Sequence, residues 1–170
     1  VFWDPTVVVP VFVKELTGSD LMVGVFSAIR ILTISLPGLW AASFLHTQPR
    51  KKPLVVWSSF GGRLPVLFIA LATLLWAGQA PWLVVVLLAI SVGMFFTSEG
   101  LNGVSWPDLV GKVLPSEIRG RFLGASQLVA SIVGLGSGRL VSLILGHAAW
   151  DLPTRWALLF ACAFVGFALS

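Results

Sequence analysis

Four long apolar runs constrain the fold of this chain more than any other feature of its sequence. They cover residues 21–45, 54–77, 82–105 and 122–149. A helix of roughly 20 residues crosses a hydrocarbon core of about 30 Å, so each run is long enough to span a membrane. Only 11% of the residues are charged, compared with about 25% in an average globular domain. We therefore expect an all-α protein, a polytopic bundle of transmembrane helices.

The two ends of the chain carry shorter apolar segments, residues 1–13 and 156–170. We interpret them as truncated parts of the first and last helices of one transmembrane domain, which covers residues 1–170. The chain has no initiator Met, and it lacks the charged region and small-residue cleavage site of a signal peptide. We therefore expect the sequence to be a fragment of a bundle of at least six helices.

Lys and Arg are distributed unequally between the two sets of loops. The connections between the second and third and between the fourth and fifth helices contain six of them: Arg50, Lys51, Lys52, Lys112, Arg119 and Arg121. The opposite loops contain two, Lys14 and Arg155. Because cytoplasmic loops retain more Lys and Arg, we expect the six cations in the cytoplasm and the chain in the plasma membrane. We attribute the net charge of +4 to this bias and expect a lipid bilayer, and no nucleic acid, as partner.

Trp residues flank two of the turns that we expect on the outer side of the membrane. They are Trp76, Trp82, Trp150 and Trp156. Amphipathic rings are enriched at the level of the lipid headgroups. Since the chain contains no Tyr, Trp alone would form this aromatic belt.

Five ionisable side chains interrupt the apolar segments: Asp4, Arg30, Arg63, Glu99 and Arg139. Such a group at the bilayer centre costs at least about 2.5–3.5 kcal/mol on insertion scales, so it needs a partner or a purpose. At about 1.5 Å per residue, the first three lie near the midplane, and the short hairpin makes Asp4 and Arg30 candidates for one ion pair. We expect Glu99 toward the cytoplasmic side and Arg139 toward the outer side, where it can snorkel. Two roles remain open for these residues: structural ion pairing, and contact with a substrate or a proton.

Small residues recur every four positions along the fifth expected helix, residues 122–149. They are Ser126, Ala130, Gly134, Gly138, Ser142 and Gly146. Such a ridge lets helix backbones approach closely, so we expect helix packing at Gly134 and Gly138. The stretch "GLGSGRL" in this run resembles a glycine-rich phosphate-binding loop. Such a loop needs a preceding strand and an exposed helix start, and this stretch lies inside a membrane span, so we interpret it as part of the packing surface.

The loops carry a resemblance to a known family. The connection "PSEIRGRFLG" contains Pro115, Arg119, Gly120 and Arg121, and the basic run Arg50, Lys51 and Lys52 lies between the second and third helices. With the short outer hairpins, these loops resemble the amino-terminal six-helix half of the major facilitator superfamily. The stretches "FWDPTVVVPVFVKELTGSDLMVGVFSAIR" and "LPGLWAASFLHTQPRKKP" are similar to prokaryotic members, and the resemblance covers essentially the whole chain.

This resemblance implies a secondary active transporter in the prokaryotic cytoplasmic membrane. It implies twelve helices, half of them in a missing carboxy-terminal half, and alternating access to a small-molecule site between the two halves. Helices one, two, four and five would line the cavity, and helix three would be peripheral. A proton or substrate gradient would drive transport.

Two other classes of protein are open from the residues alone. One is a non-transport membrane subunit or scaffold, in which the buried charges are purely structural. The other is an intramembrane enzyme, which needs paired acids, a metal cluster or a Ser-His arrangement at one depth; the sequence offers none, so we expect no enzyme. Cys162 is the single Cys, and His46 and His147 lie at helix ends on opposite sides, so we expect neither a metal nor a cofactor.

Overall fold

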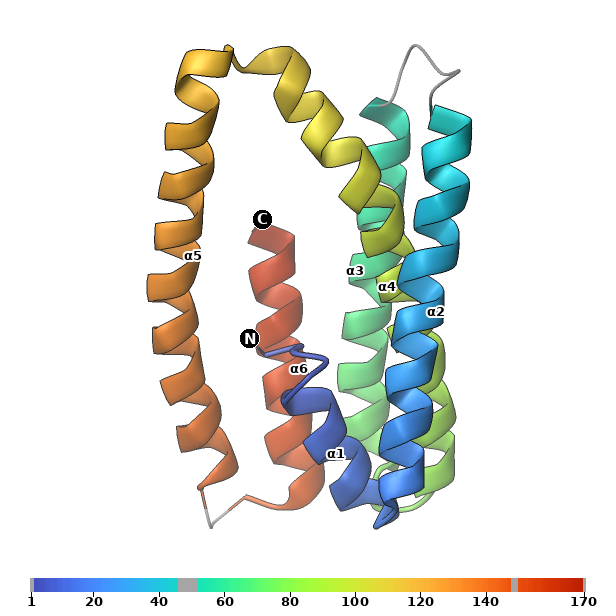
Figure 1. Ribbon diagram of the computed structural model, residues 1–170. Coiled ribbons are helices and arrows are strands. Elements are labelled where there is room, and N and C mark those ends of the chain that lie inside the picture. Colours follow the sequence, from blue (N-terminus) through green and yellow to red (C-terminus); the bar gives the residue numbers. More distant parts are fainter. Residues whose placement is uncertain (1, 46–51, 148–149, 170) are drawn as a thin grey trace.

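Six helices follow one another in the part of the chain that the computed structural model describes, residues 2–45, 52–147 and 150–169 (Figure 1). They are α1 (Val8–Thr17), α2 (Asp20–Leu45), α3 (Lys52–Trp76), α4 (Pro81–Val113), α5 (Ser116–Leu145) and α6 (Leu152–Leu169). No strand occurs within those residues. The expected all-α class is therefore confirmed.

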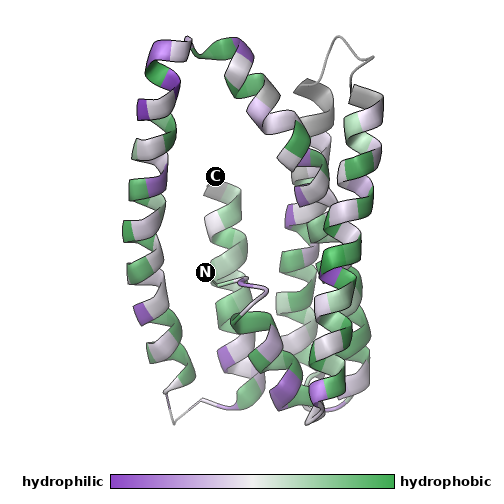
Figure 2. Cartoon of the chain, viewed as in Figure 1, coloured by the Kyte–Doolittle hydropathy of each residue, from purple (hydrophilic) through white to green (hydrophobic). Residues whose placement is uncertain are grey.

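Four of these helices are long and apolar enough to cross a membrane. The candidate spans among the described residues are Asp20–Ser43, Val56–Trp76, Pro81–Val113 and Ser116–Leu145, and a shorter apolar helix covers Leu152–Ala168. They correspond to the four long runs of the sequence. Figure 2 shows hydrophilic residues gathered at the α1–α2 and α4–α5 turns, with apolar residues along the helices between them. The helices thus suit a membrane-embedded protein.

The helices alternate in direction. The α1–α2, α3–α4 and α5–α6 turns lie at one end of the molecule. The α4–α5 turn lies at the other end, where α2 ends and α3 begins (Figure 1). The α4–α5 turn, with Arg119 and Arg121 just after it, therefore lies at the same end as the last turn of α2 and the first turn of α3.

The first helix differs from its expected bounds, residues 1–13. It begins only at Val8 and continues to Thr17, because Asp4 organises a turn before it. The Asp4 carboxylate accepts hydrogen bonds from the Thr6 hydroxyl at 2.6 Å and from the backbone N–H groups of Thr6 and Val7 at 2.8 and 3.1 Å. Gly18 ends α1 with a left-handed φ of 67°, a conformation that glycine adopts without strain.

The connection between α4 and α5 is shorter than the sequence indicated. We expected a loop over residues 107–121, whereas α4 continues to Val113 and α5 begins at Ser116. Pro107, expected at a segment end, lies inside α4. A proline there removes a helical hydrogen bond and bends the helix, and α4 does bend toward α5 in its carboxy-terminal part (Figure 1).

An aromatic core joins the amino-terminal segment to α4 and α6. Trp3 and Phe12 both pack against Phe160, with ring centroids 5.3 and 5.1 Å away. Trp156 is only 1% exposed, and its Nε1 donates a 2.8 Å hydrogen bond to Glu15. The Trp156 ring, which we expected in the aromatic belt, is thus enclosed by tertiary packing instead of facing outward.

Glycine and serine let α4 approach both of its neighbours. Gly38 of α2 and Gly100 of α4 meet backbone to backbone, and a Cβ at Gly100 would collide with the Ile34 carbonyl. On the other side, a Cβ at Gly62 of α3 would lie 2.7 Å from the Ser98 Cβ. Close crossings of this kind are typical of packing between apolar helices.

Helix α5 stands apart from the other helices over most of its length (Figure 1). It has no buried residue, and a Cβ at Gly138 would have no neighbouring atom within 4 Å. The expected packing at Gly138 is therefore not formed with any described helix, and α5 meets α4 and α6 only near its two ends.

Candidate functional site

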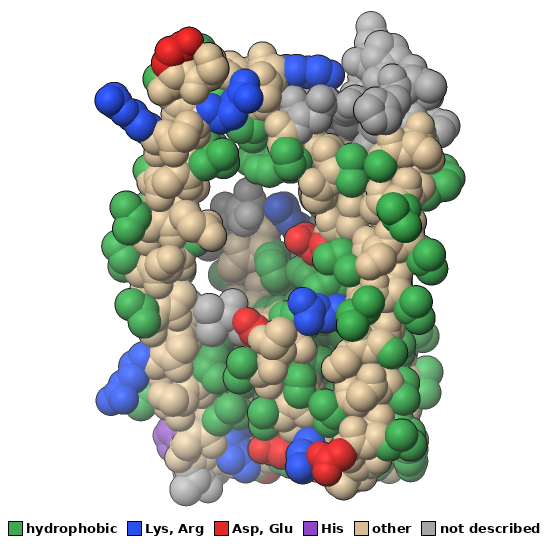
Figure 3. Space-filling view, in the orientation of Figure 1, with side chains coloured by type: hydrophobic (Ala, Val, Ile, Leu, Met, Phe, Trp, Pro, Cys, Tyr) green, Lys and Arg blue, Asp and Glu red, His purple; other side chains and the backbone are tan. Residues whose placement is uncertain are grey.

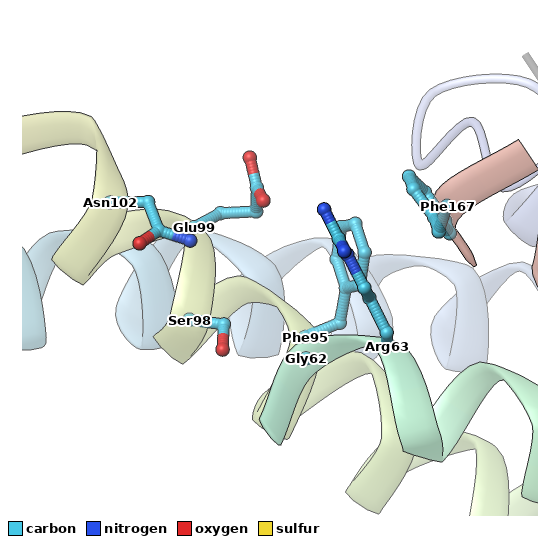
Figure 4. A pocket seen from close by; sticks show the side chains of 7 residues that line it. All are labelled: Gly62, Arg63, Phe95, Ser98, Glu99, Asn102 and Phe167. Carbon is cyan, nitrogen blue, oxygen red and sulfur yellow. The ribbon is translucent and has the colours of Figure 1, made fainter. Parts of the chain in front are cut away.

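A cavity of about 280 Å³ lies between α3, α4 and α6. Its lining residues are Gly62, Arg63, Phe95, Ser98, Glu99, Asn102 and Phe167 (Figure 4). Two of the five expected intramembrane charges, Arg63 and Glu99, are therefore on its wall.

The close crossing of α3 and α4 positions these two charges. Gly62 touches Ser98 across the crossing, and Arg63 and Glu99 are the next residues along each helix. Their side chains project to the same side of the two helices (Figure 4). Contact between a glycine and a serine thus brings a guanidinium and a carboxylate to one cavity.

Arg63 and Glu99 influence each other without forming a direct ion pair. Arg63 is half-buried and Glu99 is exposed, and the Arg63 charge acts electrostatically on the Glu99 carboxylate. Among the residues described, the ion pair within 4 Å joins Lys14 to Asp20, at 2.8 Å, beside the α1–α2 turn. Both intramembrane charges thus retain capacity for a further partner.

The remaining cavity wall is partly polar and partly aromatic. Ser98 donates its hydroxyl hydrogen to the Ser58 carbonyl, and the Ser58 hydroxyl donates to Asn102 Oδ1 at 2.6 Å. The ring centroids of Phe95 and Phe167 are 5.1 Å apart, and Figure 4 shows Phe167 on α6 facing Arg63. The cavity therefore combines opposite charges with an apolar surface.

The expected ion pair between Asp4 and Arg30 is not formed. The local turn before α1 occupies the Asp4 carboxylate. The Arg30 guanidinium carbon instead lies 5.6 Å from the centroid of the Phe96 ring, a cation–π distance. Arg30 Nε is buried with no hydrogen-bond partner.

Arg139 and the loop residues lie away from the cavity. Arg139 is exposed on α5. Arg119 Nη2 donates to the Gly111 and Leu114 carbonyls at 2.8 and 3.1 Å, so it closes the end of α4. Pro115, Gly120 and Arg121 are outside the cavity lining, Arg50, Lys51 and His46 fall outside the described residues, and Lys52 begins α3.

Sequence reasoning missed the meeting of Arg63 with Glu99. We expected Arg63 near the midplane on a peripheral helix and Glu99 nearer the cytoplasm, yet α3 lies against both α4 and α6. The sequence does carry a signal for this proximity, because a short turn joins α3 to α4. Counted from that turn, Arg63 lies 13 residues before the end of α3 and Glu99 lies 18 residues after the start of α4. Their depths differ by about 7.5 Å at 1.5 Å per residue, which two long side chains can bridge.

The space-filling view shows a hollow between α5 and the remaining helices. Basic and acidic side chains are exposed at mid-height within it (Figure 3). Charge at mid-height in a bundle of apolar helices is costly and marks a functional region by default.

Metal ligands do not gather in the described part of the chain, where no group of three or more His, Cys, Asp or Glu could hold an ion. The His147 ring stacks on Trp150 with centroids 4.4 Å apart.

Comparison with protein-family models, curated proteins and solved structures finds no significant match to this chain.

Proposed function

We propose that this chain belongs to a secondary active transporter that moves a small solute across a membrane by alternating access, coupled to an ion. Its helices would form the amino-terminal half of a major facilitator type fold in the prokaryotic cytoplasmic membrane. In that fold the two halves rock against each other around a site that lies between them. The cavity of this chain lies between α3, α4 and α6, so we place the solute site on a different set of helices from the one that the resemblance implies.

The cavity between α3, α4 and α6 carries this proposal. Arg63 and Glu99 lie inside helices that are long enough to cross a membrane, where ionised groups are expensive. They line the same cavity without an ion pair between them. A solute that binds there would compensate these charges, and a proton would neutralise Glu99, which gives the two residues a purpose beyond stability.

A non-transporting membrane scaffold accounts less well for this geometry. In a scaffold the buried charges only need to be stable, and direct pairing is the arrangement that limits their cost. Arg63 and Glu99 face a cavity instead. The free carboxylate of Glu99 also offers a group that can gain and lose a proton during transport.

The test is uptake by the full-length protein in proteoliposomes, with and without a pH gradient. A panel of radiolabelled amino acids, sugars and organic acids serves as the solutes. We expect at least one to accumulate faster when the gradient is imposed. Glu99→Gln should remove the dependence on the gradient, because the amide cannot carry the proton, while Arg139→Gln on exposed α5 should retain it. Gradient-driven uptake at the wild-type rate in Glu99→Gln, or no uptake of any solute, contradicts the proposal.

A further inference from the structure

The cavity presents opposite charges on two of its walls. The Arg63 guanidinium comes from α3 and the Glu99 carboxylate from α4, and both point to the same side (Figure 4). Phe167 of α6 supplies an apolar wall across from Arg63, in contact with Phe95. A ligand in this space meets a cation, an anion and two aromatic rings.

Charge balance restricts which ligands suit the cavity. An anion alone compensates Arg63 and leaves Glu99 uncompensated, and a cation alone leaves Arg63 uncompensated. A charge removed from water without a partner is heavily penalised. A neutral apolar ligand compensates neither group. A molecule with one charge of each sign compensates both.

The volume of the cavity restricts the size of the ligand. Pockets that hold drug-sized ligands have volumes of roughly 300–1,000 Å³, and this cavity has a volume of about 280 Å³. A solute smaller than a typical drug, such as an amino acid, therefore suits it.

We propose that the cavity binds a small zwitterion that has a carboxylate, an ammonium group and a short apolar body. The carboxylate pairs with Arg63, the ammonium group pairs with Glu99, and the apolar body packs against Phe95 and Phe167. The proposal rests on the proposed transport function, because it names the class of solute that this site accepts.

Equilibrium binding to the full-length protein in detergent tests the proposal with three probes that share one skeleton. Leucine carries both charges, isocaproate lacks the ammonium group, and isoamylamine lacks the carboxylate. We expect leucine to bind about 100-fold or more tightly than either analogue, since each analogue leaves one of the two cavity charges without a ligand partner. Failure of leucine to bind overturns the proposal, and so does equal or tighter binding of isocaproate, which would indicate an anion site with a protonated Glu99.

Three variants connect the binding to the cavity. Arg63→Gln and Glu99→Gln should each weaken leucine binding about 100-fold, whereas Arg139→Gln, which removes an exposed Arg of α5, should bind as the wild type does. Thermal unfolding shows whether each variant is folded. Arg63→Lys provides a second measurement if Arg63→Gln does not fold, because it keeps the charge but lacks the bidentate geometry; we expect it to bind about tenfold more weakly. Binding that is unchanged in either cavity variant overturns the proposal.

Measurements of leucine binding and of solute uptake together distinguish the zwitterion site from the transport function. Leucine binding without uptake in proteoliposomes would contradict the transport function and leave the zwitterion site standing. Gradient-driven uptake of another solute without leucine binding would overturn the zwitterion site and leave the transport function standing.

Discussion

Two arginine side chains close helix ends in this molecule. Arg119 donates from Nη2 to the Gly111 and Leu114 carbonyls at the end of α4, and Arg155 Nη1 donates to the Leu145 carbonyl at the end of α5, at 3.0 Å. The last carbonyls of a helix lack partners within it, and a cation there also interacts favourably with the helix dipole. These arginines therefore stabilise the turns that follow α4 and α5.

Replacement of Arg119 should destabilise the α4–α5 turn. Arg119→Gln removes charge-assisted hydrogen bonds to two backbone carbonyls, so we expect a loss of about 1–2 kcal/mol of unfolding free energy. Thermal unfolding of the full-length protein in detergent measures the effect. Arg121→Gln is the matched control, because Arg121 is exposed two residues further along α5. Equal stability of the two variants would show that the Arg119 contacts contribute nothing.

At the scale of helices, close backbone contact distinguishes α4 from α5. Gly100 of α4 lies against the backbone of Ile34 and Gly38 in α2. In the small-residue ridge of α5, Gly138 has no such partner, because a Cβ there would face open space. Small residues therefore matter here where helices cross, and a regular spacing along one helix does not identify the crossing.

Enlargement of Gly100 should disturb the bundle. In Gly100→Ala the new Cβ meets the Ile34 carbonyl oxygen, and backbone atoms cannot rotate away as a side chain can. We expect a loss of about 3 kcal/mol or more of unfolding free energy, measured by thermal unfolding in detergent. Gly103→Ala on the same helix and Gly138→Ala on α5 should be tolerated, because a Cβ at either position meets no atom within 4 Å. A Gly100→Ala protein as stable as these controls would refute the close crossing.

For the whole molecule, the alternating helices place the loops at two ends with different charge. Lys112, Arg119 and Arg121 lie around the α4–α5 turn, and Gln79 lies in the uncharged α3–α4 turn. Loops rich in Lys and Arg stay in the cytoplasm. The asymmetry therefore predicts which end faces inward.

Thiol labelling in intact cells measures this orientation. With Cys162→Ser as background, we expect an impermeant reagent to label Gln79→Cys from outside and Ser116→Cys only after the membrane is opened. Both positions are exposed, so accessibility within the fold does not limit the reaction. The reverse pattern of labelling would invert the proposed topology.

The sequence by itself determined the helices and their alternation. Backbone polar groups inside a bilayer must be satisfied within each segment, which leaves helices as the structure for long apolar runs. The turns followed from the breaks between the apolar runs. Helix ends were less predictable, because the Asp4 turn before α1 and the Arg119 contacts across the α4–α5 turn depend on side-chain hydrogen bonds.

Only the tertiary structure decided which helices meet and hence which charges share a cavity. Most helices here are apolar on several faces, so hydropathy does not indicate the packed face. Gly62 lies against the Ser98 side chain, and Gly100 lies against the backbone of α2. The crossing of α3 and α4 brings Arg63 to the cavity of Glu99, while Arg30 lies over Phe96 rather than beside Asp4. Depth along a helix can be counted from the sequence, but the direction in which a side chain points depends on where two backbones fit together.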